Sequence, residues 1–143
     1  MTKITPFLWF DNVAGEAAKY YVSIFPNSRI VNENPMFVTF EIAGQTIMAL
    51  NGGPQQFKFT EAISFFVDCE DQAEVDRYWN KLVGDGGAEG QCGWLKDKYG
   101  LSWQIVPRRL GELFASTEPG KAGRVNAAML KMHKLIVKDL EAA

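Results

Sequence analysis

Hydrophobic and polar positions follow the same order twice along this chain. An apolar run ends at Trp9-Phe10-Asp11, and a second apolar run ends 57 residues later at Phe66-Val67-Asp68. A segment with apolar residues at helical spacing follows each run, with buried stripes predicted at Ala14, Ala17, Ala18, Tyr21 and Phe25, and at Val75, Tyr78, Trp79 and Leu82. The pattern predicts a duplicated strand–helix–strands unit, and two such units usually face each other across a shared cleft.

Strand and capping signals complete each unit. Residues 36–42 and 45–51 alternate around a turn and predict a hairpin, and residues 101–106 predict a last strand closed by a proline. Asp11 or Asn12 is expected to cap the first helix. Asp71, with Glu74 three residues later, has the spacing of a capping box for the second. We place module one at about residues 1–55, module two at about 58–107 and a C-terminal extension at 108–143.

The extension is predicted to contain one long helix, from about Arg124 to Glu141. An apolar stripe runs along it and must be covered either by the domain's own sheet or by another subunit; it comprises Val125, Ala128, Met129, Met132, Leu135, Ile136 and Leu140. A dimer element and a tail packed on its own domain explain this stripe equally well.

Composition limits the function classes. The chain has 143 residues, 47% hydrophobic and 22% charged, which is typical of one globular domain with a core of its own. No apolar run approaches the roughly 18 residues of a membrane span, and no signal-peptide pattern opens the chain, so we expect a cytoplasmic protein without a membrane partner. The net charge of −2 argues against nucleic acid as the main partner.

Three stretches resemble a known family: residues 4–11 (ITPFLWFD), 21–28 (YVSIFPNS) and 90–107 (GQCGWLKDKYGLSWQIVP). They are similar to the PhnB-like branch of the glyoxalase/bleomycin-resistance/dioxygenase superfamily, the vicinal oxygen chelate proteins. The resemblance implies an α+β fold in which two tandem βαβββ modules form a curved, mostly antiparallel sheet around a cleft, assembled as homodimers. Some members carry a 3-demethylubiquinone methyltransferase label. We expect no methyltransferase here, because no glycine-rich strand–turn–helix is present to hold S-adenosylmethionine.

Superfamily enzymes hold a divalent metal with His, Glu or Gln side chains at four strand positions. The repeat places these positions at Thr5, Asn51, Ala62 and Gln104, and a slip of one residue would put Glu61 in place of Ala62. Alanine cannot bind a metal, and a hydroxyl and two amides are poor ligands for zinc, nickel or iron. The only histidine, His133, is distant in sequence. We therefore expect no metal and no other cofactor.

The remaining cleft positions predict an apolar and aromatic small-molecule pocket with a few amides and hydroxyls. The candidate ligand-binding residues are Thr5, Phe7, Trp9, Asn51, Ser64, Cys92, Trp94 and Gln104. By alternation Ile47, Ala49, Ala62, Phe66 and Ser102 would share this face, although Phe7, Ile47 and Phe66 also fit an ordinary core. Asn51 and Gln104 are favoured, since a buried amide without a partner is costly.

We expect both cysteines to be packed side chains rather than reactive thiols. Cys92 lies between glycines, where its sulfur is approachable, but no base is near it in sequence to form the thiolate. Cys69 has acidic neighbours that disfavour a thiolate. Trp94 could equally be a stacking wall or a packed residue.

The sequence leaves several functions open. The leading hypothesis is a metal-independent protein that binds a small molecule in the cleft between the modules. The alternative is an enzyme, acting through a metal held by other residues or through acid–base chemistry on a small carbonyl or phosphonate-related compound. A structural dimer with a filled cleft is the third hypothesis.

Overall fold

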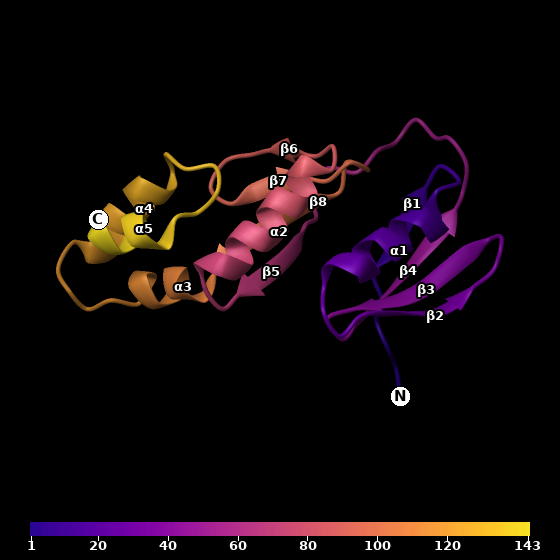
Figure 1. Cartoon of the computed structure of the whole chain (residues 1–143), viewed down its shortest axis with the longest axis horizontal. Helices are drawn as coiled ribbons and strands as arrows, with labels where there is room; N and C mark the ends of the chain where they lie inside the picture. The colour runs from indigo at the N-terminus through magenta and orange to yellow at the C-terminus, as the bar shows by residue number, and fades with distance from the viewer. The chain divides into compact units, whose positions relative to one another are not determined.

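The computed structural model describes all 143 residues, which divide into two compact units, Met1–Lys58 and Phe59–Ala143. Each unit contains one four-stranded sheet and is described here by itself (Figure 1). No helix is long and apolar enough to cross a membrane.

The first unit is a βαβββ module. Its sheet has the order β1-β4-β3-β2, in which β1 runs parallel to β4 and the other pairs are antiparallel. Its elements are β1 (Phe7–Phe10), α1 (Ala14–Ile24), β2 (Arg29–Glu33), β3 (Phe37–Ile42) and β4 (Gln45–Asn51).

The second unit repeats this topology. Its sheet has the order β5-β8-β7-β6, again with the first strand parallel to the last. Its elements are β5 (Phe65–Cys69), α2 (Gln72–Gly84), β6 (Ala88–Glu89), β7 (Trp94–Lys96) and β8 (Ser102–Pro107). The predicted α+β fold of tandem βαβββ modules is confirmed, as two four-stranded mixed sheets.

One helix covers one face of each sheet, as the two apolar stripes predicted. In the first unit the buried alanines of α1 allow close approach to the sheet, and Tyr21 stacks on Phe40 of β3 with ring centroids 6.3 Å apart. In the second unit Val75, Tyr78, Trp79 and Leu82 of α2 are buried, as is Trp103 of β8. Within each unit no helix covers the opposite face of the sheet, which we call the open face.

The two helices begin differently. The predicted cap of α2 is confirmed: Asp71 accepts a hydrogen bond from the Glu74 amide at 3.0 Å, and Glu74 accepts one from the Glu70 amide. The predicted cap of α1 by Asp11 or Asn12 is wrong. The N-cap position is Val13, and the first amide of the helix, that of Ala14, donates instead to Asn51 at the end of β4. A local sequence pattern could not identify a cap supplied 37 residues away.

The extension forms three short helices: the first bears out the helical turn expected around Leu110 to Phe114, and the other two stand in place of the predicted single helix at 124–141. These are α3 (Arg108–Phe114), α4 (Lys121–Met129) and α5 (Val137–Ala142), and residues 130–136 form a non-helical segment that we call the docking segment. Gln72 of α2 stabilises the break: its amide donates to Leu135 O at 3.0 Å and accepts from Val137 N at 2.7 Å.

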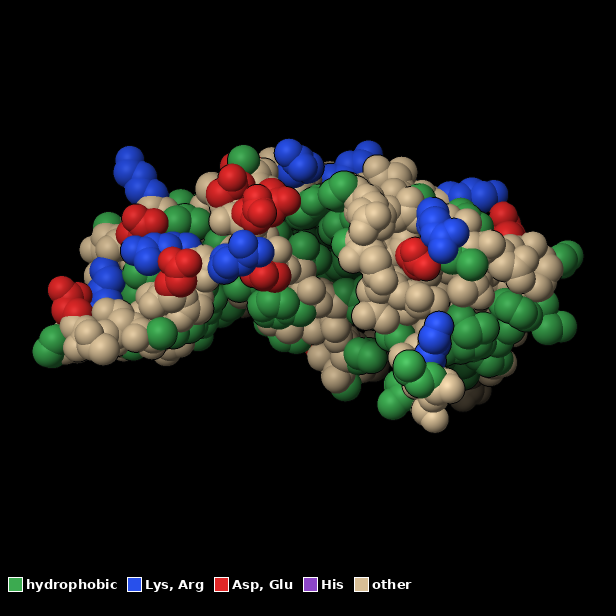
Figure 2. Space-filling view, turned by 90° about the horizontal axis from the view of Figure 1, so that it is seen from below, with side chains coloured by type: hydrophobic (Ala, Val, Ile, Leu, Met, Phe, Trp, Pro, Cys, Tyr) green, Lys and Arg blue, Asp and Glu red, His purple; other side chains and the backbone are tan.

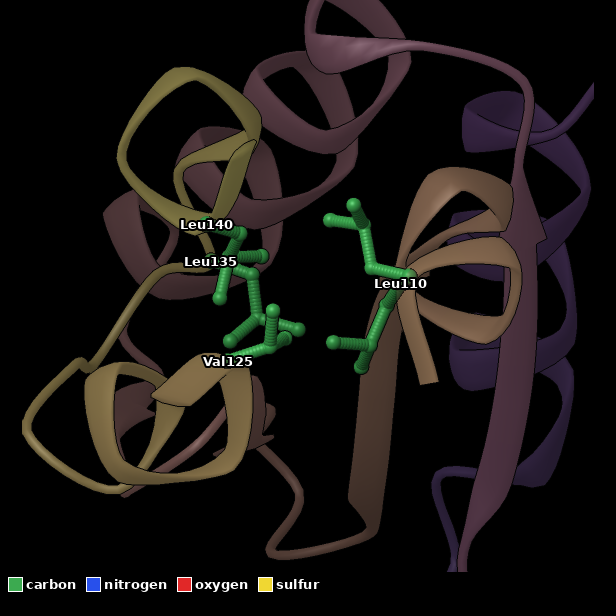
Figure 3. Packing of buried hydrophobic residues seen from close by; sticks show 5 residues of the cluster. Leu110, Val125, Leu135 and Leu140 are labelled. Carbon is green, nitrogen blue, oxygen red and sulfur yellow. The ribbon is translucent and has the colours of Figure 1, made fainter. Parts of the chain in front are cut away.

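The apolar stripe of the extension is covered within the chain. Side chains from α3, α4, the docking segment and α5 point toward one another and form a small core (Figure 3), made of Leu110, Leu113, Val125, Leu135 and Leu140. Met129 and Met132 are partly buried against it. This packing within the chain covers every residue of the predicted stripe except Ile136, and the homodimer that the resemblance implies stays a prediction.

A buried carboxylate organises the turn between β7 and β8. Asp97 accepts hydrogen bonds from the backbone amides of Tyr99 and Leu101, and its second oxygen accepts from Trp103 Nε1 at 2.9 Å. A buried charged acceptor with three donors holds both the turn and the central tryptophan of the second core in place.

We predict that Leu135→Ala lowers the free energy of unfolding by about 2–5 kcal/mol, because Leu135 is fully buried in the extension core. Leu130→Ala is the matched control, since Leu130 belongs to the same segment and is 57% exposed. Urea unfolding followed by circular dichroism measures both. Equal losses for the two variants would contradict the packing described.

We predict that Asp97→Ala destabilises the protein more than Asp97→Asn. Alanine leaves three donors without an acceptor, whereas asparagine keeps one side-chain oxygen. The expected losses are about 3 and about 1–2 kcal/mol, at roughly 1 kcal/mol for each unmade bond. Thermal unfolding of both variants provides the comparison, and an unaltered Asp97→Ala protein would show that this network does not contribute to stability.

Candidate functional site

The open face of the second sheet carries a row of aromatic and amide side chains. Residues paired across neighbouring strands share a face, and the register pairs Gln104 of β8 with Phe66 of β5 on one side and Trp94 of β7 on the other. Phe66 is 59% exposed. Gln104 Nε2 donates to Ser64 Oγ at 3.0 Å, so the structure brings three predicted site residues, Ser64, Trp94 and Gln104, into one group.

A pocket of about 640 Å³ opens beside this row. Its walls are Glu61, Ala88, Glu89, Gly90, Gln91, Cys92, Trp94, Leu95, Lys96 and Ser102. Its size falls in the usual range for small-molecule sites, and two predicted residues, Cys92 and Trp94, line it.

Ser102 is the most unusual residue of this pocket. It is 1% exposed, and its hydroxyl has no hydrogen-bond partner. It pairs with Lys96 across β7 and β8, which places it on the open face. The sequence indicated Ser102 as a face residue by alternation, but a missing partner can be seen only in the structure.

Two of the charged side chains at the pocket neutralise each other. Lys96 Nζ lies 2.6 Å from a Glu61 carboxylate oxygen, and this hydrogen bond lowers the pKa of the Glu61 carboxyl. The third, Glu89, accepts a hydrogen bond from Trp79 Nε1 at 3.4 Å.

His133 lies much nearer to the predicted site than the sequence indicated. Its Nδ1 is 2.7 Å from Gly90 O, the amide of Cys92 donates to Met132 O, and the amide of Gly93 donates to His133 O. The docking segment thus lies against the loop that carries Cys92. Sequence distance concealed this contact, which spans 43 residues.

The two cysteines differ in environment. Cys69 is fully buried, and burial, followed by the charges of Glu74 and Asp68, raises the pKa of its thiol to about 12. The expected suppression of a Cys69 thiolate is confirmed, with burial as the larger cause. Cys92 is only partly buried and lines the pocket.

In the first unit the open face is aromatic and apolar. Phe7 is 54% exposed, and Trp9 lies on the same face because it is two residues further along β1. Trp9 Nε1 donates to Gly53 O at 3.0 Å, its ring meets Phe57 edge-on at 5.3 Å, and it leaves no space for a side chain at Gly52. Thr5 is partly buried and precedes β1. On the surface seen in Figure 2, apolar side chains lie among charged ones of both signs.

The predicted facing of β4 is wrong. Phe7 pairs with Met48 and Trp9 with Leu50, so these residues occupy the open face, whereas Ile47, Ala49 and Asn51 face α1. Asn51 accepts from Ala14 N at 2.9 Å and donates to Pro35 O at 3.1 Å. Its amide is thus engaged in local structure rather than on the face that carries Trp9. A shift of one residue reverses every side chain of a strand, which explains the error.

This register also bears on the metal positions. Trp9 and Phe66 correspond in the repeat, and their partners are Leu50 and Gln104, so the counterpart of Gln104 is Leu50 rather than Asn51. Ala62 occupies a turn before β5, and Glu61 is paired with Lys96. No group of three or more His, Cys, Asp or Glu side chains converges that could hold a metal ion. The side chains at these positions do not fit a divalent metal.

The predicted site residues therefore form two sets. Thr5, Phe7, Trp9 and Asn51 belong to the first unit, and Ser64, Cys92, Trp94 and Gln104 to the second. Of the second set, Cys92 and Trp94 line the pocket together with Lys96 and Ser102, and Ser64 and Gln104 belong to the neighbouring row that includes Trp94.

Comparison with known structures supports the fold. A glyoxalase-related enzyme from Fulvimarina pelagi is 14% identical over 77% of this chain and 91% of its own, with a TM-score of 0.55. The fosfomycin resistance protein FosX from Listeria monocytogenes, complexed with Mn(II) and sulfate, is 18% identical over 71% of this chain and 86% of its own, with a TM-score of 0.53. At these identities the likeness concerns the fold alone.

A nearer relative and a family match identify the branch. The PhnB protein from Bacillus cereus, which carries a 3-demethylubiquinone-9 3-methyltransferase description, is 35% identical over 74% of this chain and 99% of its own, with a TM-score of 0.68. No curated protein matches the chain. The family described as 3-demethylubiquinone-9 3-methyltransferase matches residues 2–106. The chain therefore belongs to this PhnB-like family, and it shares the fold of the glyoxalase-related enzyme and of FosX.

Proposed function

We propose that this protein binds a small organic molecule on the open face of its second sheet, without a divalent metal. The observation that carries the proposal is the row Phe66–Gln104–Trp94, in which an amide held by Ser64 lies between two aromatic side chains on a face that no helix of the unit covers. The aromatic side chains offer apolar contact to a ligand, and the amide and hydroxyl offer hydrogen bonds that fix the orientation of the ligand.

The adjoining pocket supports the same proposal. At about 640 Å³ it has room for a drug-sized molecule, and Trp94 links it to the row. A purely structural sheet would pack this face, whereas Phe66 remains exposed and the Ser102 hydroxyl remains unpaired.

The metal-independent part of the proposal rests on side-chain chemistry. FosX is a structural relative whose structure contains Mn(II). The four candidate metal positions that the repeat places in this chain carry a threonine, an alanine, an amide and, by the observed register, a leucine. Such a set provides too few donors for a first-row metal.

We predict that the protein, purified without chelator and without a metal-affinity tag, contains first-row metals far below one equivalent per chain. The physical reason is the absence of imidazole and carboxylate groups at the candidate positions. Elemental mass spectrometry makes the measurement, with a zinc protein handled in parallel as the positive control. One equivalent of manganese, nickel, iron or zinc would contradict metal independence and favour a metalloenzyme.

We predict that Gln104→Leu weakens binding of a ligand found by fragment screening roughly tenfold, because the face loses its amide. Asn51→Leu is expected instead to lower the free energy of unfolding by about 1 kcal/mol, since Asn51 serves the start of α1, and to leave affinity unchanged. Calorimetric titration and thermal unfolding separate the two effects. Unaltered affinity in a folded Gln104→Leu protein would remove Gln104 from the site.

A further inference from the structure

The docking segment forms backbone and side-chain contacts with one wall of the second unit's pocket. Met132 O and His133 O accept the amides of Cys92 and Gly93, each at 2.8 Å, and His133 Nδ1 lies 2.7 Å from Gly90 O. Three contacts within the four-residue loop 90–93 fix that loop against the extension.

The loop has a strained backbone conformation that these contacts help to hold. Cys92 has φ 58° and Gly93 φ 86°, and the first of these is unfavourable for a residue with a side chain. A side chain at Gly93 would come within 3.0 Å of Leu135 Cδ1, so the glycine also lets the docking segment approach closely. Leu135 is at the same time a member of the extension core.

This conformation brings Cys92 into the lining of a pocket that contains an unpaired hydroxyl. Ser102 Oγ is buried without a hydrogen-bond partner, which costs about 1–3 kcal/mol unless a bound molecule supplies one. Trp94 lines the same pocket and provides aromatic surface. The pocket therefore offers flat apolar contact together with one unsatisfied hydrogen-bonding group.

The charges at the pocket do not call for a charged ligand. Glu61 and Lys96 neutralise each other, and Glu89 is engaged with Trp79. An anion would have to displace Glu61 from Lys96 and approach Glu89, while a cation would compete with Lys96 for Glu61. A neutral molecule avoids both costs.

We propose that the docking segment completes this pocket for a small, neutral, planar molecule bearing a single carbonyl or hydroxyl oxygen, with that oxygen at Ser102 and the ring against Trp94. The inference deepens the proposed function and rests on it, naming the ligand class and the segment that shapes the site. Residues 107–143 lie outside the family match. The extension thus holds one wall of the pocket, the loop at residues 90–93, from outside the matched part of the chain.

The test uses the full chain and three matched probes: acetophenone, which is neutral with a carbonyl; ethylbenzene, which lacks the oxygen; and benzoate, which is charged. Two-dimensional NMR titration follows the backbone amides and the Trp94 indole. We expect acetophenone to bind about five- to tenfold more tightly than ethylbenzene, the value of one hydrogen bond, and more tightly than benzoate. Benzoate binding as tightly as acetophenone, or tighter, would overturn the assignment of a neutral ligand.

Two variants test the residues. Ser102→Ala is expected to abolish the preference for acetophenone over ethylbenzene and to raise the stability of the free protein, because it removes a buried hydroxyl that has no partner. His133→Ala is expected to weaken binding of both uncharged probes by loosening the loop at Gly90. Lys131→Ala, an exposed change in the same segment, is the control for His133 and is expected to alter neither.

Thiol alkylation gives an independent readout of the loop. Cys92 is expected to react faster in His133→Ala than in the wild type and more slowly with acetophenone bound, whereas Cys69 stays unreactive because burial raises the pKa of its thiol to about 12. Unchanged Cys92 reactivity in a folded His133→Ala protein would overturn the role of the docking segment.

The outcomes separate this inference from the proposed function. If Ser102→Ala leaves the acetophenone preference intact while Gln104→Leu weakens binding, the pocket assignment fails and the open-face proposal stands. If no probe shifts any resonance of the pocket, the ligand class is wrong, and the fragment screen still decides whether the protein binds a small molecule. If screening also yields no ligand for the open face, both proposals fail.

Discussion

The parallel pairing between the first and last strands of each module determines which side chains can form a site. Because side chains alternate along a strand, the register of β5 against β8 places Phe66 and Gln104 on one face and directs Trp103 and Ile105 toward α2. β7 then adds Trp94 to the same row. The helix-facing side is a conventional apolar core, and the opposite side is left with aromatic rings, an amide and hydroxyls. The properties of the candidate site follow from this division.

The same rule shows how far the sequence could lead. The order of elements, the stripes of both helices and the capping of α2 by Asp71 were predicted correctly, because each depends on local spacing. The side of the sheet to which each residue of β4 points was not predicted correctly. Alternation shows which residues share a face, but it does not show which of the two sets faces the helix. That choice depends on the register of β4 against β1, in which Trp9 pairs with Leu50. Asn51 thereby became a cap for α1 rather than a cleft residue.

The extension illustrates a second limit of sequence reasoning. Its apolar residues continue at helical spacing through residues 130–136, which predicts one long helix. The helix ends because tertiary contacts supply other partners for the backbone. Gln72 bonds to Leu135 O and Val137 N, and the amides of Cys92 and Gly93 donate to the carbonyls of the two residues at 132 and 133. The hydrogen bonds that replace the helical ones come from elsewhere in the chain, so no local pattern encodes them. His133 came to lie next to Gly90 for the same reason.

Two hydrogen bonds of Gln72 connect the first turn of α2 to Leu135 and to the first residue of α5, Val137. Detaching the extension would break the hydrogen bonds of the Gln72 side chain to Leu135 and Val137, and those of the Cys92 and Gly93 backbone amides, at the same time. Local opening of the pocket wall is therefore energetically coupled to fraying of α2, and the amides of both regions should exchange with solvent as one cooperative unit. The extension thus behaves as an integral layer of the second module rather than as an independent tail.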